Sequence, residues 1–222
     1  PGEQPRRILE YHPCWDLDKM PHTPKKKQIP SEDDVLKLVM AADPDRERPL
    51  ILVLLCTLAR IDEALRLRWE DVRFDARTVT LWTRKRKGGS YESDTLPMTE
   101  ELFKVLWKEW EKREQNEWVF YNPKTETRYL RRPKLIKSLC KKAGIDPPIT
   151  WHDFRHFMAS YLADSQKVSK KTISHILRHR ALGTTEIYLH SMDESVRAAM
   201  NNVDGLFSRL NGEEAKKRID KK

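Results

Sequence analysis

The chain has 222 residues, of which 43 are lysine or arginine and 34 are acidic, so its formal net charge is +9. A basic balance of this size favours an anionic partner such as nucleic acid. No apolar run reaches the roughly 18 residues of a membrane span, and the sequence has neither a P-loop pattern nor G-x-G-x-x-G, which argues against a nucleotide-driven enzyme. The three cysteines stand far apart without a C-x-x-C pair. This pattern argues against a disulfide framework or a cysteine zinc site and favours the reducing cytoplasm.

The N-terminal half begins with a segment rich in proline and charge, residues 1–30, which is expected to be a linker or N-terminal arm. Ser31 has the side chain of a helix N-cap and is followed by acids, so a short helix is expected to about Ala42. A largely buried helix should run from near residue 46 to 58, and a third helical stretch over 62–67.

The hydrophobic period then changes. Over residues 78–83 apolar and polar side chains alternate, a glycine turn follows at 88–90, and a returning strand is expected over 94–98. Residues 72–98 therefore predict a small antiparallel sheet inside an otherwise helical chain.

The remaining sequence is mainly helical in pattern, apart from a short extended run at 118–121. Helices are expected from Thr99 and over 131–142, 151–163, 170–178, 184–190 and 196–210. The fold class is therefore mainly α with a small antiparallel β-sheet. We expect three regions: the arm 1–30, one domain over 31–195, and a C-terminal helix with a charged tail over 196–222.

Arg60 lies at the end of the most apolar helix, where a permanent charge is costly without an anionic partner. An ion pair with Glu63 or Asp62 would satisfy it, and binding of an external anion is the alternative.

His152 and Arg155 are three residues apart at the start of a predicted helix, so they are expected to share a face. Because a helix N-terminus favours anions, the pair could hold a phosphate. The alternative is a capping histidine and a surface arginine.

Two further patterns are open to more than one interpretation. Tyr188 follows two threonines and is either an exposed nucleophile or a packing residue. The basic run at 84–87 is either a solvated strand end or a hairpin that enters a DNA groove.

Together these residues are the set that a metal-free transesterification at a phosphodiester requires. Two guanidinium forks can bind the non-bridging oxygens of the transition state in place of metal ions. A tyrosine hydroxyl is a feasible nucleophile, and lysine or histidine can give a proton to the leaving sugar oxygen.

Three motifs occur in order: residues 57–72 around Arg60, H-x-x-R at 152–155, and Leu177-Arg178-His179 followed by T-x-x-Y at 185–188. With the predicted hairpin between the first two, and His179 nine residues before Tyr188, the chain resembles the tyrosine recombinases of the phage-integrase type. The resemblance covers about residues 28–195. It departs where Leu58-Ala59 replaces a frequent Gly-Leu and where Arg178 replaces a glycine.

The resemblance implies a tyrosine-recombinase catalytic-domain fold and site-specific DNA recombination through a 3′-phosphotyrosine on Tyr188. Lys87 would protonate the leaving 5′-oxygen, with Lys85 as the alternative register, and Glu63 would orient Arg60. The implied catalytic residues are Arg60, Lys87, His152, Arg155, His179 and Tyr188. DNA-binding residues are expected at Arg84, Lys85, Arg86, Arg131, Arg132, Lys134 and Arg178.

The implied partner is double-stranded DNA, with a homotetramer in the synaptic complex and no metal, nucleotide cofactor or membrane. The N-terminal core-binding domain of the family is not recognised in residues 1–30, and the chain begins with Pro1 rather than Met. We therefore expect an isolated catalytic domain from a fragment or a processed chain.

Three other functions compete with this interpretation. A type IB topoisomerase-like relaxing enzyme would use the same chemistry. A non-catalytic DNA-binding domain would explain the basic helices but not the co-occurrence of the catalytic set. A metallohydrolase would use His152 and His156, four apart as in H-E-x-x-H, with His179 or His190 as third ligand. That site would lack the glutamate base and would carry Arg155 beside the metal.

Overall fold

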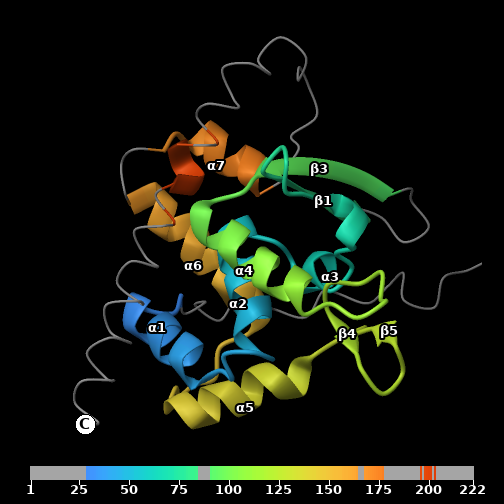
Figure 1. Ribbon diagram of the computed structural model, residues 1–222. Coiled ribbons are helices and arrows are strands. Elements are labelled where there is room, and N and C mark those ends of the chain that lie inside the picture. Colours follow the sequence, from blue (N-terminus) through green and yellow to red (C-terminus); the bar gives the residue numbers. More distant parts are fainter. Residues whose placement is uncertain are drawn as a thin grey trace, which may run out of the picture.

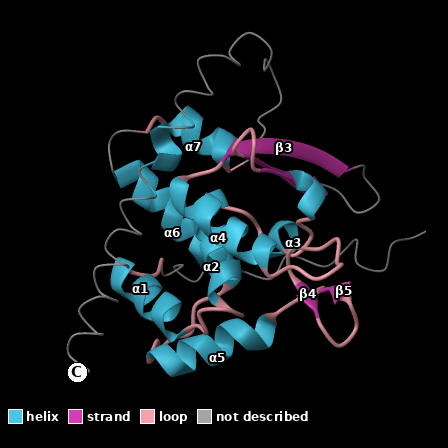
Figure 2. Cartoon of the chain, viewed as in Figure 1, coloured by secondary structure: helices cyan, strands magenta, loops and turns pink. Residues whose placement is uncertain are grey.

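The computed structural model describes residues 29–84, 91–164 and 168–177, together with 196, 198–201 and 203. Helices and short sheets follow one another along the chain (Figures 1 and 2). In order they are α1 (Glu32–Ala41), α2 (Arg48–Thr57), α3 (Ile61–Ala64), the 3-10 turn η1 (Trp69–Asp71), β1 (Val72–Arg73), β2 (Thr78–Arg84), β3 (Tyr91–Pro97), α4 (Glu100–Glu111), β4 (Tyr121–Asn122), β5 (Thr127–Arg128), α5 (Pro133–Ala143), α6 (Trp151–Asp164) and α7 (Lys170–Ile176).

The central helix is α2, whose side chains from Leu50 to Thr57 are nearly all buried. Contacts with α1, α4 and α6 surround it. In Figure 1 the three-stranded sheet and α7 lie toward one end of α2, and α1 and α5 lie toward the other. Because α2 is buried along its length, the chain that leaves its last turn toward Arg60 starts from a fixed point in the core.

The predicted start of α1 is confirmed at the atomic level. The Asp34 backbone N–H donates to Ser31 Oγ at 3.1 Å, and the Ser31 backbone N–H donates to Asp34 Oδ2 at 3.1 Å. This reciprocal pair is a capping box, which satisfies two backbone donors that a helix start otherwise leaves open. The buried face of α1 packs on α5.

The predicted antiparallel sheet is also confirmed, with strand order β1-β2-β3. Val79 pairs with Val72 on one side and with Leu96 on the other, and β2 and β3 stay paired out to Arg84 and Tyr91. Val79, Leu81 and Leu96 are buried, so the alternation seen in the sequence places one face of the sheet on the core.

Several predicted bounds need correction. The helical stretch expected over 62–67 is the single turn of α3, because the chain must turn into the bridge that pairs Arg68 with Trp118. The basic helix begins at Pro133, so Arg131 and Arg132 precede it. Proline is well suited to a first helical position because its missing N–H has no intrahelical partner there.

Two further features lie in the C-terminal half. The extended run expected over 118–121 contains the bridge residue Trp118 and the first residue of β4. β4 pairs with β5 as an antiparallel hairpin, which the sequence pattern did not indicate. Val196, Ala199, Met200 and Val203 are buried in the same hydrophobic core as the helices. The helix expected over 184–190 lies outside the described residues. Within the part of the chain that the structure describes, no helix is both long and apolar enough to cross a membrane.

Candidate functional site

Arg60 is the N-cap residue of α3 and is held by Glu63 three residues later. Its backbone N–H donates to Glu63 Oε2 at 2.9 Å, and its Nη1 donates to Oε1 at 2.8 Å. The side chain of Glu63 is 2% exposed, whereas that of Arg60 is 43% exposed. The buried carboxylate of Glu63 thus holds Arg60 from the core side. The guanidinium of Arg60 keeps a solvent-facing side on which an anion can bind.

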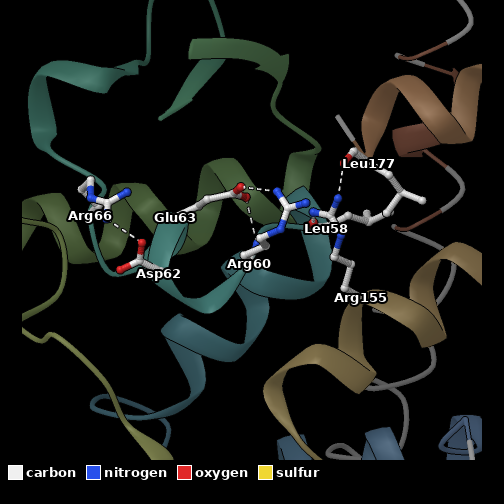
Figure 3. Close-up of polar contacts among 7 residues, drawn as sticks. All are labelled: Leu58, Arg60, Asp62, Glu63, Arg66, Arg155 and Leu177. Atoms are coloured by element: carbon white, nitrogen blue, oxygen red, sulfur yellow. Dashed lines mark hydrogen bonds and ion pairs between the residues drawn. The ribbon is translucent and has the colours of Figure 1, made fainter. Parts of the chain in front are cut away.

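The alternative partner named by the sequence, Asp62, pairs elsewhere. Arg66 Nη2 donates to Asp62 Oδ2 at 2.5 Å, one helical turn further along. Figure 3 shows the two pairs side by side on the same segment, with Asp62 and Arg66 turned away from Arg60. The two acids of α3 therefore serve different arginines.

Arg155 extends from α6 and is 3% exposed. Its Nη1 donates to the backbone carbonyl of Leu58 at 2.6 Å, and its Nη2 donates to the carbonyl of Leu177. Figure 3 shows the guanidinium between these two carbonyls, which come from the end of α2 and the end of α7. Arg155 thereby links the segment just before Arg60 to the residue just before Arg178.

Leu58 makes this contact possible through its backbone conformation. Its φ is 51° and its ψ is 30°, in the left-handed region that usually ends a helix with glycine. This position corresponds to the glycine of the Gly-Leu pair in the resemblance described above. Leu58 is fully buried, and the hydrophobic burial of its side chain offsets a backbone conformation that costs about 1–2 kcal/mol for a residue with a Cβ.

His152 lies in the first turn of α6 and is exposed. Asp153 beside it is buried, and its Oδ2 accepts from both the backbone N–H and the Oγ1 of Thr150, at 2.6 and 2.7 Å. The His152 and His156 rings meet edge to face, with centroids 4.5 Å apart. Asp153 therefore fixes the start of α6, and His152 and Arg155 leave the same helix in an exposed and a buried environment respectively.

Other predicted site residues lie outside the described residues, so their roles stay predictions. They are Lys85, Arg86, Lys87, Arg178, His179 and Tyr188. Arg84 ends β2, and Leu177 caps α7. The attachment points of these segments are therefore known: residues 85–90 join paired strand ends, and residue 178 follows the carbonyl that Arg155 binds.

The predicted DNA-binding residues near α5 lie on the surface. Arg131 and Lys134 are exposed, and Arg132 places its guanidinium carbon 4.4 Å from the centre of the Tyr129 ring. No described contact joins them to Arg60 or Arg155, so the structure does not place them in the same cluster.

Sequence reasoning missed the acceptors of Arg155, because backbone carbonyls have no residue-type signal. Asp71 belongs to the motif at 57–72, but its contact was missed: it is buried, and its Oδ1 accepts from Trp82 Nε1 at 2.7 Å. Among the described residues no group of three histidine, cysteine or acidic side chains could hold a metal ion. The third ligands of the metallohydrolase alternative, His179 and His190, fall outside that set.

Comparison with known proteins gives one consistent result. The family model described as "Phage integrase family" matches residues 30–195. The tyrosine recombinase XerA of Pyrococcus furiosus is 27% identical over 202 residues, which are 88% of this chain and 68% of the relative.

Two solved structures share the fold. The crystal structure of XerA recombinase matches with a TM-score of 0.61 and 26% identity, over 79% of this chain and 65% of that one. A XerH site-specific recombinase bound to palindromic difH substrate matches with a TM-score of 0.53 and 23% identity, over 76% and 50%. The matched regions thus cover between one half and about two thirds of these three chains.

Proposed function

The chain belongs to the phage integrase family of tyrosine recombinases, and we propose that it breaks and rejoins double-stranded DNA in site-specific recombination through a phosphotyrosine on Tyr188. The observation that carries this proposal is the contact of Arg155 with the Leu58 carbonyl, at 2.6 Å across 97 residues of sequence. It brings the segment before Arg60 into contact with Arg155, as a phosphate-binding site shared by the two arginine motifs requires.

The exposures of the two arginines support complementary roles at that phosphate. Arg60 is partly exposed and oriented by Glu63, so it can bind a non-bridging oxygen directly. Arg155 is buried with two of its five N–H groups on carbonyls, so its guanidinium is already oriented before DNA arrives. Fixed donors of this kind stabilise developing negative charge without reorganising during the reaction.

In the proposed cleavage step one P–O bond forms as another breaks. The phenolic oxygen of Tyr188 attacks phosphorus and loses its proton, a Tyr–O–P bond forms, and the P–O5′ bond breaks. Lys87 gives the departing 5′-oxygen a proton, while His152 and His179 position the phosphate and assist proton transfer. The 5′-hydroxyl of a partner strand then attacks the phosphotyrosine and releases Tyr188, so exchange requires neither ATP nor a metal.

The relatives support recombination rather than relaxation of supercoils, because those compared above are named recombinases. We propose double-stranded DNA as the partner and a homotetramer as the synaptic assembly. We propose further that residues 31–195 are the catalytic domain, flanked by the arm and the C-terminal tail. Basic residues beside the site would contribute phosphate contacts, so DNA affinity should fall steeply as salt rises.

A cytoplasmic location follows from the same proposal, since the DNA substrate is there.

The test traps the covalent adduct on nicked suicide duplexes. The duplexes have a randomised centre, so that the wild-type protein first selects the sequence that it cleaves. Tyr188→Phe should abolish the adduct on denaturing gels and leave DNA binding within about twofold, because it removes a hydroxyl and little else. An adduct that forms with Tyr188→Phe would assign the nucleophile elsewhere. A wild-type protein that binds DNA but never forms an adduct would favour the DNA-binding alternative.

A further inference from the structure

The hairpin formed by β2 and β3 is a two-stranded ribbon over much of its length. β1 pairs with Thr78 and Val79 only, so residues 80–84 of β2 have β3 as their single partner among the described strands. A two-stranded ribbon twists easily and is marginally stable by itself. Residues 85–90, which include the predicted general acid Lys87, are attached to the far end of this ribbon.

A buried carboxylate holds the ribbon near that end. Trp82 Nε1 donates to Asp71 Oδ1 at 2.7 Å, and Asp71 Oδ2 accepts from the backbone N–H of Arg68 at 3.2 Å. Asp71 is 8% exposed and lies in η1, directly before β1. Both carboxylate oxygens are thus used, one on η1 itself and one on the outer face of β2. Where β1 no longer pairs with β2, this side-chain hydrogen bond of Trp82 still connects β2 to η1.

A second contact restrains the other strand. The guanidinium carbon of Arg66 lies 4.9 Å from the centre of the Tyr91 ring, and Tyr91 is the first residue of β3, paired with Arg84. Arg66 is itself tied to Asp62 on α3, the turn that begins at Arg60. The two strand ends that flank residues 85–90 are therefore connected to the segment that carries the first arginine.

Packing on the core holds only the inner face of the ribbon, where Leu81 and Thr83 are buried. On its outer side Arg66, Asp71, Trp82 and Tyr91 line an open pocket of about 380 Å³. Trp82 is 38% exposed and Tyr91 47% exposed, so burial of their rings is incomplete. Among the contacts described on this outer side, the hydrogen bond of Trp82 is the directional one.

From this geometry we infer that Trp82 and Asp71 are positioning residues for the general acid: they set the orientation of the hairpin that delivers Lys87 to the leaving 5′-oxygen. The inference rests on the proposed function. A general acid acts only within hydrogen-bond reach of its oxygen, and a misplacement of about 1 Å can cost about 100-fold in rate. Trp82 lies two residues before the end of β2, so loss of its hydrogen bond is expected to shift the strand end to which residues 85–90 are attached.

The test compares two substrates in single-turnover cleavage. One suicide duplex has the normal 5′-oxygen at the scissile phosphate, and the other has a 5′-bridging sulfur, which leaves without protonation. Trp82→Phe keeps an aromatic side chain, although a smaller one, and removes the N–H. It should slow cleavage of the oxygen substrate about tenfold or more and leave the sulfur substrate within about twofold of wild type, as Lys87→Ala should do more strongly.

The chain offers a matched control in Trp107 on α4. Trp107 is 41% exposed and its Nε1 donates to the Glu111 carboxylate at 3.0 Å. Its described ring contacts are with Phe74 and Phe103 and not with residues 80–84 or 91–95. Trp107→Phe should leave the cleavage rate of both substrates unchanged. If Trp82→Phe slows both substrates equally, or neither, Trp82 is not a positioning residue for the acid.

Hydrogen exchange separates this inference from the proposed function. Trp82→Phe should speed amide exchange in residues 80–84 and 91–95, and Trp107→Phe should not. A wild-type protein that forms no adduct on any duplex would overturn the proposed function and the acid role together. Unchanged exchange in an active protein would overturn the role of Trp82 alone.

Discussion

At the scale of single residues, the geometry of the site depends on which carboxylate pairs with which arginine. Glu63 is almost fully buried and uses both oxygens on Arg60, whereas Asp62 is exposed and pairs with Arg66. Neutralising a buried carboxylate that is paired with an arginine is costly, because it leaves the arginine with an unmatched donor. Glu63 is therefore expected to act on catalysis through the orientation of Arg60 rather than by touching DNA.

Glu63→Gln tests this role. The two Arg60 donors use different oxygens of Glu63, and in glutamine one of these oxygens becomes an NH2 group, so one Arg60 donor would face another donor. We expect adduct formation to slow by about tenfold and stability to fall by about 1–3 kcal/mol, measured by single-turnover cleavage and urea unfolding. Glu70→Gln is the control, because the Glu70 side chain is 71% exposed and its pair with Arg68 is a surface contact. Equal effects of the two substitutions would contradict the role of Glu63.

At the scale of elements, helix ends decide where the functional side chains emerge. Leu58 ends α2 in the left-handed region and Gly144 ends α5 in the same region, with φ of 67°. The two ends differ in side chain. Leu58 fills the core, whereas a Cβ added at Gly144 would meet no atom within 4 Å. Glycine at 144 is therefore required by backbone conformation and not by space.

Gly144→Ala should destabilise the protein by about 1 kcal/mol, because the methyl group disfavours a positive φ and gains no contact. Gly144→Asn should cost less, since asparagine tolerates this region. Denaturant unfolding measures both. An alanine variant as stable as wild type would show that α5 can end in another way.

At the scale of the whole molecule, surface charges connect elements that are distant in sequence. Asp45, between α1 and α2, accepts from Lys112 Nζ at 2.7 Å and lies 3.0 Å from Lys108 Nζ. Lys108 is in the last turn of α4 and Lys112 is its C-cap. These lysines lower the pKa of Asp45 from 3.8 to about 2, mainly through their hydrogen bonds. The folded state thus favours the ionised form, so the stabilisation is present above pH 4 and is lost as the pH falls toward 2.

Asp45→Asn should lower the melting temperature at pH 7 by a small amount, and the difference from wild type should vanish as the pH falls toward 2. A pH series of thermal melts checks this. Because the Asp45 side chain is 58% exposed, the difference should also shrink in high salt. A difference that persists at pH 2 would mean that the aspartate acts through something other than its charge.

The sequence by itself determined the order of the elements and the candidate chemistry. Ser31 and Thr99 mark helix starts, the alternation around Val79 marks a strand, and the spacing of His152, Arg155 and Tyr188 identifies the family. These features are local, so propensity, capping and hydrophobic period are enough to predict them.

Only the tertiary structure decided how the distant motifs meet. Arg155 donates to two backbone carbonyls from distant segments. Leu58 has a positive φ, which the burial of its side chain offsets. Asp71 accepts a hydrogen bond from Trp82 of the hairpin. None of these contacts has a pattern in the sequence, because each depends on which segments the core brings within 3 Å of each other. Local pattern therefore predicts which residues can act, and packing of the buried α2 decides which of them face one another.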